Sequence, residues 1–164
     1  KVAILAQLTT LFEDCCSVLE LGSYSGQHAF HFAKNIPHLS WQLSDRPLAI
    51  EALSHNYAQT NLTNVLAPIA LDVSKAEHWP KQQFDAIYSA NTLHIMSAEH
   101  VNALFQNLPY VCQPNTLLVV YGPFNYQGKY TSESNREFQH WLQERDPVSG
   151  IRDFEWVNEL DWKW

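Results

Sequence analysis

The sequence predicts an α/β fold in which helices cover both faces of a doubly wound, mostly parallel sheet. One observation behind this prediction is that short apolar runs alternate with amphipathic helical patterns about five times along the chain. A second is that 164 residues with a hydrophobic fraction of 46% provide one sizeable core and are too few for two comfortable domains. We therefore expect residues 1–164 to form a single domain.

The first half of the chain is expected to contribute three helices and three strands. Residues 2–13 form a helix with one apolar face, which consists of Ile4, Leu5, Leu8, Leu11 and Phe12. Buried-strand patterns follow at 17–21, 39–44 and 65–71. Helical patterns lie between the strands, at 26–34 before Pro37, and from Pro47, which suits a first helical turn, to about Thr60.

The second half of the chain continues the alternation of strands and helices. The remaining elements are expected at 84–90 (strand), 97–108 (helix), 116–121 (strand) and 134–145 (helix). Ser97 is a suitable N-cap for the first of these helices. The strand at 116–121 is the clearest, because Pro-Asn precedes it and Gly-Pro follows it. Ser134 and Glu137 have the spacing of a capping box for the last helix.

Composition argues against two classes of function. The net charge is −7 and the ten basic residues form no cluster, whereas proteins that bind nucleic acids or anionic membranes group Lys and Arg. We therefore expect no general nucleic-acid binding and no membrane association. The longest apolar runs, such as 117–121, are also far shorter than the roughly 20 residues that span a bilayer.

The cysteines indicate the redox compartment. Cys15, Cys16 and Cys112 form an odd set with one adjacent pair, which is neither a disulfide framework nor a zinc-binding spacing. A reducing compartment, and so a cytoplasmic location, is expected. No metal site is expected.

A glycine-containing turn follows the first predicted strand, in VLELGSYSG. The dinucleotide motif G-x-G-x-x-G, counted from Gly22, requires glycine at 24 and 27, where the chain has Tyr24 and Gln27. The methyltransferase pattern acid-x-G-x-G-x-G is matched by Glu20, Gly22 and Gly26 and departs only at Tyr24. Such a turn suits the methionine part of S-adenosylmethionine, whose carboxylate can meet backbone N–H groups at a helix start.

Acidic residues end the first three strands at the edge of the sheet where ligands bind in this fold class. Asp45 follows the glycine turn at the spacing of about 20 residues that is typical of a carboxylate binding ribose hydroxyls. Asp72 is placed to accept a hydrogen bond from an adenine amino group, and Glu20 to favour the positive amine of the cofactor, directly or through water. Together the three acids predict a nucleoside-type cofactor.

The predicted cofactor-binding residues come from the ends of four strands. They are Glu20, Gly22, Ser23, Tyr24, Gly26, Asp45, Asp72, Val73 and Ala90. Each acid also has a simpler interpretation: Glu20 as a solvated strand-end acid, Asp45 as a helix cap before Pro47, and Asp72 as a turn residue.

Several stretches of the chain together resemble one protein family, DUF938 or methyltransferase-like 26. The stretches are VLELGSYSGQHAFHFA, LSWQLSD, FDAIYSANTLHIMS, YGPF and TSESNREFQHWLQERDPVSGIRD. The resemblance implies a Rossmann-like, class I S-adenosylmethionine-dependent methyltransferase fold, with S-adenosylhomocysteine as the product. Members of the family have more sequence at both ends, so residues 1–164 are expected to be a partial domain that lacks a C-terminal antiparallel strand pair after Glu159.

The family usually has glycine or another small residue at the position of Tyr24. A tyrosine forced to positive φ costs about 1–2 kcal/mol. Either the turn keeps ordinary φ angles here or cofactor affinity is lower than in the rest of the family.

No catalytic signature is decisive, because the cofactor brings an activated methyl group and the protein chiefly holds the reactants in line. Asn91 is a candidate to orient the acceptor, and His94 is a candidate base, with a structural role as its alternative. Tyr121, at the end of the last predicted strand, is a third candidate and begins the YGPF segment. That segment walls an acceptor pocket or is simply a tight strand exit.

The sequence thus predicts a methyltransferase that uses S-adenosylmethionine to methylate an unidentified acceptor, with a small molecule favoured over a protein. Two other interpretations stay open. The chain is a non-catalytic binding module on the same fold, or it is an NAD-dependent oxidoreductase, against which the failed glycine spacing argues.

Overall fold

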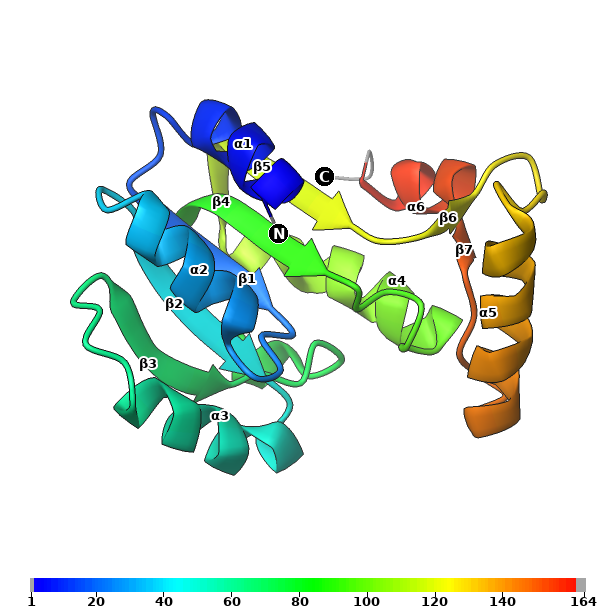
Figure 1. The fold of residues 1–164 in the computed structure, drawn as a ribbon, viewed down its shortest axis with the longest axis horizontal. Coiled ribbons are helices and arrows are strands. Elements are labelled where there is room, and N and C mark those ends of the chain that lie inside the picture. Colours follow the sequence, from blue (N-terminus) through cyan, green and yellow to red (C-terminus); the bar gives the residue numbers. More distant parts are fainter. Residues whose placement is uncertain (1, 162–164) are drawn as a thin grey trace.

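The computed structural model describes residues 2–161 and confirms the predicted fold class. Within this range the main sheet has five strands in the order β3-β2-β1-β4-β5, and every neighbouring pair is parallel. The strands are β1 (Ser17–Leu21), β2 (Ser40–Asp45), β3 (Val65–Ala70), β4 (Phe84–Ala90) and β5 (Cys112–Tyr121). Because β1 lies in the middle and the chain proceeds to both sides of it, the sheet is doubly wound (Figure 1).

Helices lie on both faces of this sheet. The described helices are α1 (Val2–Leu11), α2 (Gln27–Asn35), α3 (Ile50–Ala58), α4 (Ala98–Asn107), α5 (Glu133–Arg145) and α6 (Phe154–Asp161), with short 3-10 turns η1 (Pro47–Ala49), η2 (Ala76–His78) and η3 (Leu108–Tyr110). Buried residues of α1, α2 and α3 belong to one core cluster, and those of α4 and α6 to another. Of the α-helices that the structure describes, α5 alone lies apart from the sheet (Figure 1). None of the helices within residues 2–161 is long and apolar enough to cross a membrane.

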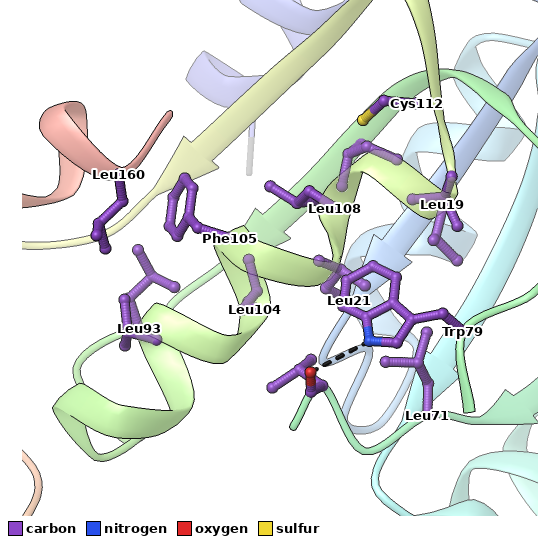
Figure 2. Close-up of a cluster of buried hydrophobic side chains, with 14 of the residues drawn as sticks. Leu19, Leu21, Leu71, Trp79, Leu93, Leu104, Phe105, Leu108, Cys112 and Leu160 are labelled. Atoms are coloured by element: carbon purple, nitrogen blue, oxygen red, sulfur yellow. Dashed lines mark hydrogen bonds between the residues drawn. The ribbon is translucent and has the colours of Figure 1, made fainter. Parts of the chain in front are cut away.

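The alternation of side chains in β1 divides the core into two layers. Leu19 and Leu21 point to the layer that contains α4 and α6, which Figure 2 shows together with Trp79 and Leu104. The Trp79 indole Nε1 donates a hydrogen bond of 3.1 Å to the Val73 carbonyl oxygen, so its one polar atom is satisfied in the core. This contact fixes the segment after β3 against the sheet.

The opposite layer is built around aromatic rings. Trp41, Tyr88 and Phe32 are fully buried, and their ring centroids lie 5.7–5.8 Å apart in each pairing. Burying each ring contributes roughly 1.5–3 kcal/mol, so this cluster is a main anchor of α2 on the sheet. Tyr88 is the register partner of Glu20, which is the penultimate residue of β1. The aromatic cluster therefore lies next to the turn that follows β1.

The cap of α5 corrects one prediction. The N-cap is Ser132, whose hydroxyl accepts a hydrogen bond of 3.1 Å from the backbone N–H of Asn135, and the predicted capping box of Ser134 with Glu137 is wrong. Ser132 has an extended backbone, with φ −156°, whereas Ser134 already lies inside the helix.

The last strand of the main sheet is longer than expected. β5 begins at Cys112, and the register with β4 shifts between Phe84 and Ala86, so the chain around Asn115 (φ 72°) is accommodated as an irregularity inside the strand. The Pro-Asn signal therefore marks a bulge within the strand.

Two short strands and α6 follow the predicted elements. β6 (Phe124–Asn125) pairs in parallel with β7 (Arg152–Asp153), and α5 lies beside the segment that enters β7, apart from the main sheet in Figure 1. There the backbone N–H of Ile151 donates to the Gln139 Oε1 at 2.6 Å. The predicted lack of a C-terminal strand pair stays a prediction, because Glu159 lies in α6 and residues 162–164 are outside the described range.

Candidate functional site

The carboxyl ends of β1, β2, β3 and β4 meet at one edge of the sheet. Parallel pairing places Leu21 beside Ser89 and Asp45 beside Ala70. The backbone N–H of Leu71 then donates to the carbonyl of Asp45 at 2.8 Å, which brings the segment containing Asp72 to the end of β2. The predicted residues at the four strand ends therefore share one edge, as the sequence analysis requires.

The turn after β1 adopts left-handed backbone at three positions. The φ angles are 75° at Gly22, 52° at Tyr24 and 79° at Gly26. Ser23 ties this turn to β2, because its backbone N–H donates to the Ser44 carbonyl at 2.9 Å and its hydroxyl accepts from the Ser44 N–H at 3.1 Å. Ser23 therefore holds the turn in place.

Tyr24 adopts a positive φ angle although it has a side chain. The turn therefore does not keep ordinary φ angles, which was the first of the two alternatives that the sequence left open. The expected strain is about 1–2 kcal/mol. Its backbone N–H donates a 2.7 Å hydrogen bond to Asp45 Oδ2, and such a charge-assisted bond offsets the strain. Because the Tyr24 side chain is 81% exposed, it does not pack into the turn.

Asp45 is fixed at the rim of this edge through both carboxylate oxygens. Oδ2 accepts from the Tyr24 N–H and Oδ1 from the Arg46 N–H, each at 2.7 Å. The N-cap residue of η1 is Arg46, and no side chain caps that turn, so Asp45 is not a helix cap. Each carboxylate oxygen can accept more than one hydrogen bond, so the half-buried Asp45 retains capacity for two ligand hydroxyls.

Asp72 is an ionised turn residue at the same edge. Its Oδ1 accepts hydrogen bonds from the hydroxyl (2.7 Å) and backbone N–H (3.0 Å) of Ser74, and the hydroxyl bond is the main cause of a lowered pKa. The neighbouring Val73 has its side chain in the core, and its carbonyl accepts from Trp79 and Asn107. The side chain and the carbonyl of Val73 are therefore engaged within the protein. Only its backbone N–H is left to contact a cofactor.

Glu20 lies beneath the turn, in the aromatic layer of the core. Its side chain is 2% exposed, and Oε2 accepts a 3.3 Å hydrogen bond from Trp41 Nε1. Burial raises the pKa of Glu20 to about 7, hydrogen bonds from Ser23 and Trp41 oppose this rise, and the charge of Asp45 adds to it. Little of this carboxylate is accessible to the ammonium group of a ligand; in the structure it ties the turn to β2.

The exit of β4 approaches the glycine turn closely. A Cβ on Gly22 would lie 2.8 Å from both Cγ2 and Oγ1 of Thr92, so only glycine fits between the two segments. The Thr92 hydroxyl donates to the Ala90 carbonyl at 3.0 Å, which orients it. Sequence reasoning missed Thr92, because the contact joins two segments that are far apart in the chain.

A cavity of about 530 Å³ opens beside this edge, between the exits of β4 and β5 and the start of α5. The lining residues are Asn91, Tyr121, Gly122, Pro123, Phe124, Tyr126, Thr131, Asn135 and Phe138. Asn91 and Tyr121 were predicted, together with the rest of the YGPF segment. Asn91 has φ 55°, and its backbone N–H donates to the Tyr121 carbonyl at 2.7 Å, which joins the two strand exits.

The structure places His94 behind this cavity. It is 6% exposed and packs edge-on against Phe138, with ring centroids 5.3 Å apart. Burial, reinforced by the charge of Arg152, lowers the pKa of His94, so the imidazole is neutral near pH 7. Since His94 does not line the cavity, this geometry fits its structural alternative.

The α5 side of the cavity was missed by the sequence analysis. The helix was predicted, but the face that its residues Asn135 and Phe138 share was not assigned. Their i, i+3 spacing was the available signal. What the sequence did not contain is the position of α5, which packs on irregular segments instead of on the main sheet.

Solved structures of methyltransferases share this fold. An O-methyltransferase family protein from Burkholderia thailandensis has a TM-score of 0.84 and 15% identity over 97% of this chain and 48% of its own. The S-adenosylmethionine-dependent methyltransferase SibL has 0.77 and 22% over 98% and 47%. Human N-acetylserotonin methyltransferase, solved in complex with SAM, has 0.74 and 14% over 92% and 41%.

At these identities the likeness shows the shared class I methyltransferase fold, and this chain spans less than half the length of each of the three proteins. The family described as "Protein of unknown function (DUF938)" matches residues 1–163. The chain therefore belongs to the DUF938 family.

Proposed function

We propose that this chain binds S-adenosylmethionine at the edge formed by β1 to β4 and methylates a small molecule held in the neighbouring cavity. The observation that carries the proposal is the left-handed turn with Asp45 fixed at its rim by two backbone N–H groups. The solved structures with this fold add support, since human N-acetylserotonin methyltransferase is in complex with SAM.

The residues at the edge fit the chemistry of this cofactor. Gly22 and Gly26 let the turn adopt left-handed backbone, and a Cβ at these positions would collide with Thr92 and Phe30, respectively. Asp45 and Asp72 present acceptors suited to ribose hydroxyls and to an amino group. Because Tyr24 and Gln27 stand where the dinucleotide motif needs glycine, the residues at this edge fit an adenosyl amino acid better than NAD.

When bound, S-adenosylmethionine supplies a methyl group on a positively charged sulfur, and the bond from that carbon to sulfur breaks as the bond to the acceptor forms. The chain's own residues bind and orient. Asp45 would hold the ribose, Asp72 the base, and the turn from Gly22 to Gly26 the amino-acid end. Asn91 would contribute its amide to positioning the acceptor, because it belongs both to the β4 exit and to the cavity lining.

The size of the cavity supports a small acceptor. Its volume of about 530 Å³ lies in the range of small-molecule sites, roughly 300–1,000 Å³. A folded protein acceptor would enter only with an extended side chain.

Calorimetric titration with S-adenosylhomocysteine and with NADH tests the proposal. We expect binding of S-adenosylhomocysteine alone, and we expect Asp45→Ala to weaken it by about 1–3 kcal/mol because a pair of ribose hydroxyls would lose its acceptor. Asp14→Ala removes an exposed acid away from this edge and is the matched control.

Unchanged affinity in Asp45→Ala would remove this residue from the proposed site. Binding of NADH without binding of S-adenosylhomocysteine would overturn the proposed function in favour of an oxidoreductase.

A further inference from the structure

We propose that the acceptor cavity takes an uncharged, planar aromatic molecule that carries a hydroxyl group. This inference rests on the proposed methyltransferase function and names the substrate class of that same site. The grounds are the chemistry of the lining, the contacts of its rings and the lack of charged side chains among the lining residues.

The lining of the cavity is largely aromatic and contains no Asp, Glu, Lys, Arg or His. Four of its nine residues are aromatic, namely Tyr121, Phe124, Tyr126 and Phe138. The polar members are the amides of Asn91 and Asn135 and the hydroxyl of Thr131, together with the two phenols. Flat rings offer stacking surfaces, and neutral amides and hydroxyls offer a few oriented hydrogen bonds, which is the usual composition of a site for a planar neutral ligand.

Each of three lining rings contacts at least one ring that does not line the cavity. Phe154 stacks on Tyr126 with centroids 5.4 Å apart and meets Phe124 edge-on at 6.1 Å. Phe138 meets His94 edge-on at 5.3 Å and stacks on Trp141 at 5.7 Å. The rings are therefore oriented before a ligand arrives, and such preorganisation reduces the entropy lost on binding.

These rings are also accessible. Tyr121 and Tyr126 are each 48% exposed, and Phe154 is exposed as well. Proteins usually cover a group of neighbouring apolar side chains or use it to bind a ligand or partner. Because Tyr121 and Tyr126 are exposed and line an open cavity, a ligand can reach them.

The lining offers no charged partner to an ionised ligand. An anionic ligand finds no lysine, arginine or histidine among the lining residues to pair with it. A cationic ligand finds ring faces but no carboxylate among the lining residues to pair with it. An uncharged aromatic ligand needs no charged partner, so it avoids the unfavourable binding expected for both anions and cations.

A methyl acceptor needs a nucleophilic atom, and a hydroxyl group supplies one while the ligand stays uncharged. In the transfer its oxygen forms a bond to the methyl carbon as the carbon–sulfur bond breaks, the sulfur becomes a neutral thioether, and the hydroxyl proton leaves to solvent. No carboxylate, imidazole or amine lines the cavity to take that proton, and the cavity is open to water.

A series of matched probes tests the inference by ligand-observed NMR titration of the full chain. The probes are naphthol, naphthoate, naphthylmethylammonium and the saturated decahydronaphthol. We expect naphthol to bind at least about tenfold more tightly than naphthoate, because the lining gives a carboxylate no cationic partner to offset its lost hydration. We expect decahydronaphthol, which cannot stack, to bind more weakly than naphthol.

Variants locate the binding. Phe138→Ala and Tyr126→Ala should each weaken naphthol binding about fivefold, which corresponds to the loss of one aromatic contact. Tyr110→Ala removes a tyrosine that is 56% exposed in η3, near the amino end of β5, and should leave the affinity unchanged. The exposed Tyr126 provides a variant that folds even where the half-buried Phe138 is needed for stability.

The outcomes separate this inference from the proposed function. If S-adenosylhomocysteine binds but naphthol does not, or if naphthylmethylammonium or naphthoate binds as tightly as naphthol, the substrate class is overturned while the cofactor site stands. If naphthol binds as expected and S-adenosylhomocysteine does not, the aromatic cavity stands and its role as an acceptor site is overturned with the proposed function.

Discussion

Gly26→Ala is expected to lower the free energy of unfolding by about 2–5 kcal/mol, because it combines two penalties. Gly26 has φ 79°, where a side chain costs about 1–2 kcal/mol. An added Cβ would also lie 2.5 Å from Cζ of Phe30, and moving that ring disturbs its packing against the core at a cost of about 1–3 kcal/mol. Urea unfolding monitored by tryptophan fluorescence measures the change.

Two control variants separate the backbone strain of Gly26→Ala from its steric contact with Phe30. Gly128 has φ 69° and nothing within 4 Å of an added Cβ, so Gly128→Ala should show the backbone strain alone, about 1–2 kcal/mol. In a Phe30→Leu background the ring contact is absent, and Gly26→Ala should cost no more than Gly128→Ala. Equal losses for Gly26→Ala and Gly128→Ala in the wild-type background would contradict the proposed close contact.

Glu20→Gln is expected to remove most of a pH dependence of stability that the wild-type chain shows between about pH 5 and about pH 8. Burial raises the pKa of Glu20 in the folded protein from 4.5 to about 7. Between these two values the folded state holds a proton that the unfolded state has released. The wild-type free energy of unfolding should therefore fall as the pH rises through this window, by an amount on the order of 2–3 kcal/mol.

Glutamine keeps an acceptor for the Trp41 indole but has no proton to release, so the variant should lack this fall. Unfolding curves at both ends of the window measure the difference between variant and wild type. Glu13→Gln, at an exposed site, is the matched control and should follow the wild type. If Glu20→Gln and wild type lose stability equally with rising pH, Glu20 is already ionised in the folded protein at the start of the window, and burial does not raise its pKa.

The sequence located the five strands of the main sheet to within a few residues, because most of them are short runs of buried side chains. By contrast, β5 begins four residues before the predicted start at 116. The run at residues 17–21 and β1 have the same bounds, and Ser97 caps α4 through the His100 N–H as predicted. The region after β5 was less predictable. β6 and β7 are two residues each, too short for a periodic pattern, and their pairing depends on where α5 and α6 pack.

The candidate site also contains some residues that the sequence predicts and others that it does not. The positions of Gly22, Gly26, Asp45 and Asp72 follow from strand order, since parallel strands bring their carboxyl ends together. Thr92 and the α5 face of the cavity depend on tertiary packing that the local sequence does not contain. The orientation of Glu20 was available from the alternation along β1, which places it on the side of Val18, toward the aromatic layer of the core.

The central claim is that the ends of the first three strands form one cradle for an adenosyl amino acid. Titrating S-adenosylhomocysteine into the chain while following its backbone amides by NMR tests this most directly. The account predicts that the largest shifts fall within residues 22–26, 45–46 and 72–74. Saturating ligand that leaves these amides unmoved, or that shifts chiefly residues 112–116 at the opposite end of the sheet, would contradict it.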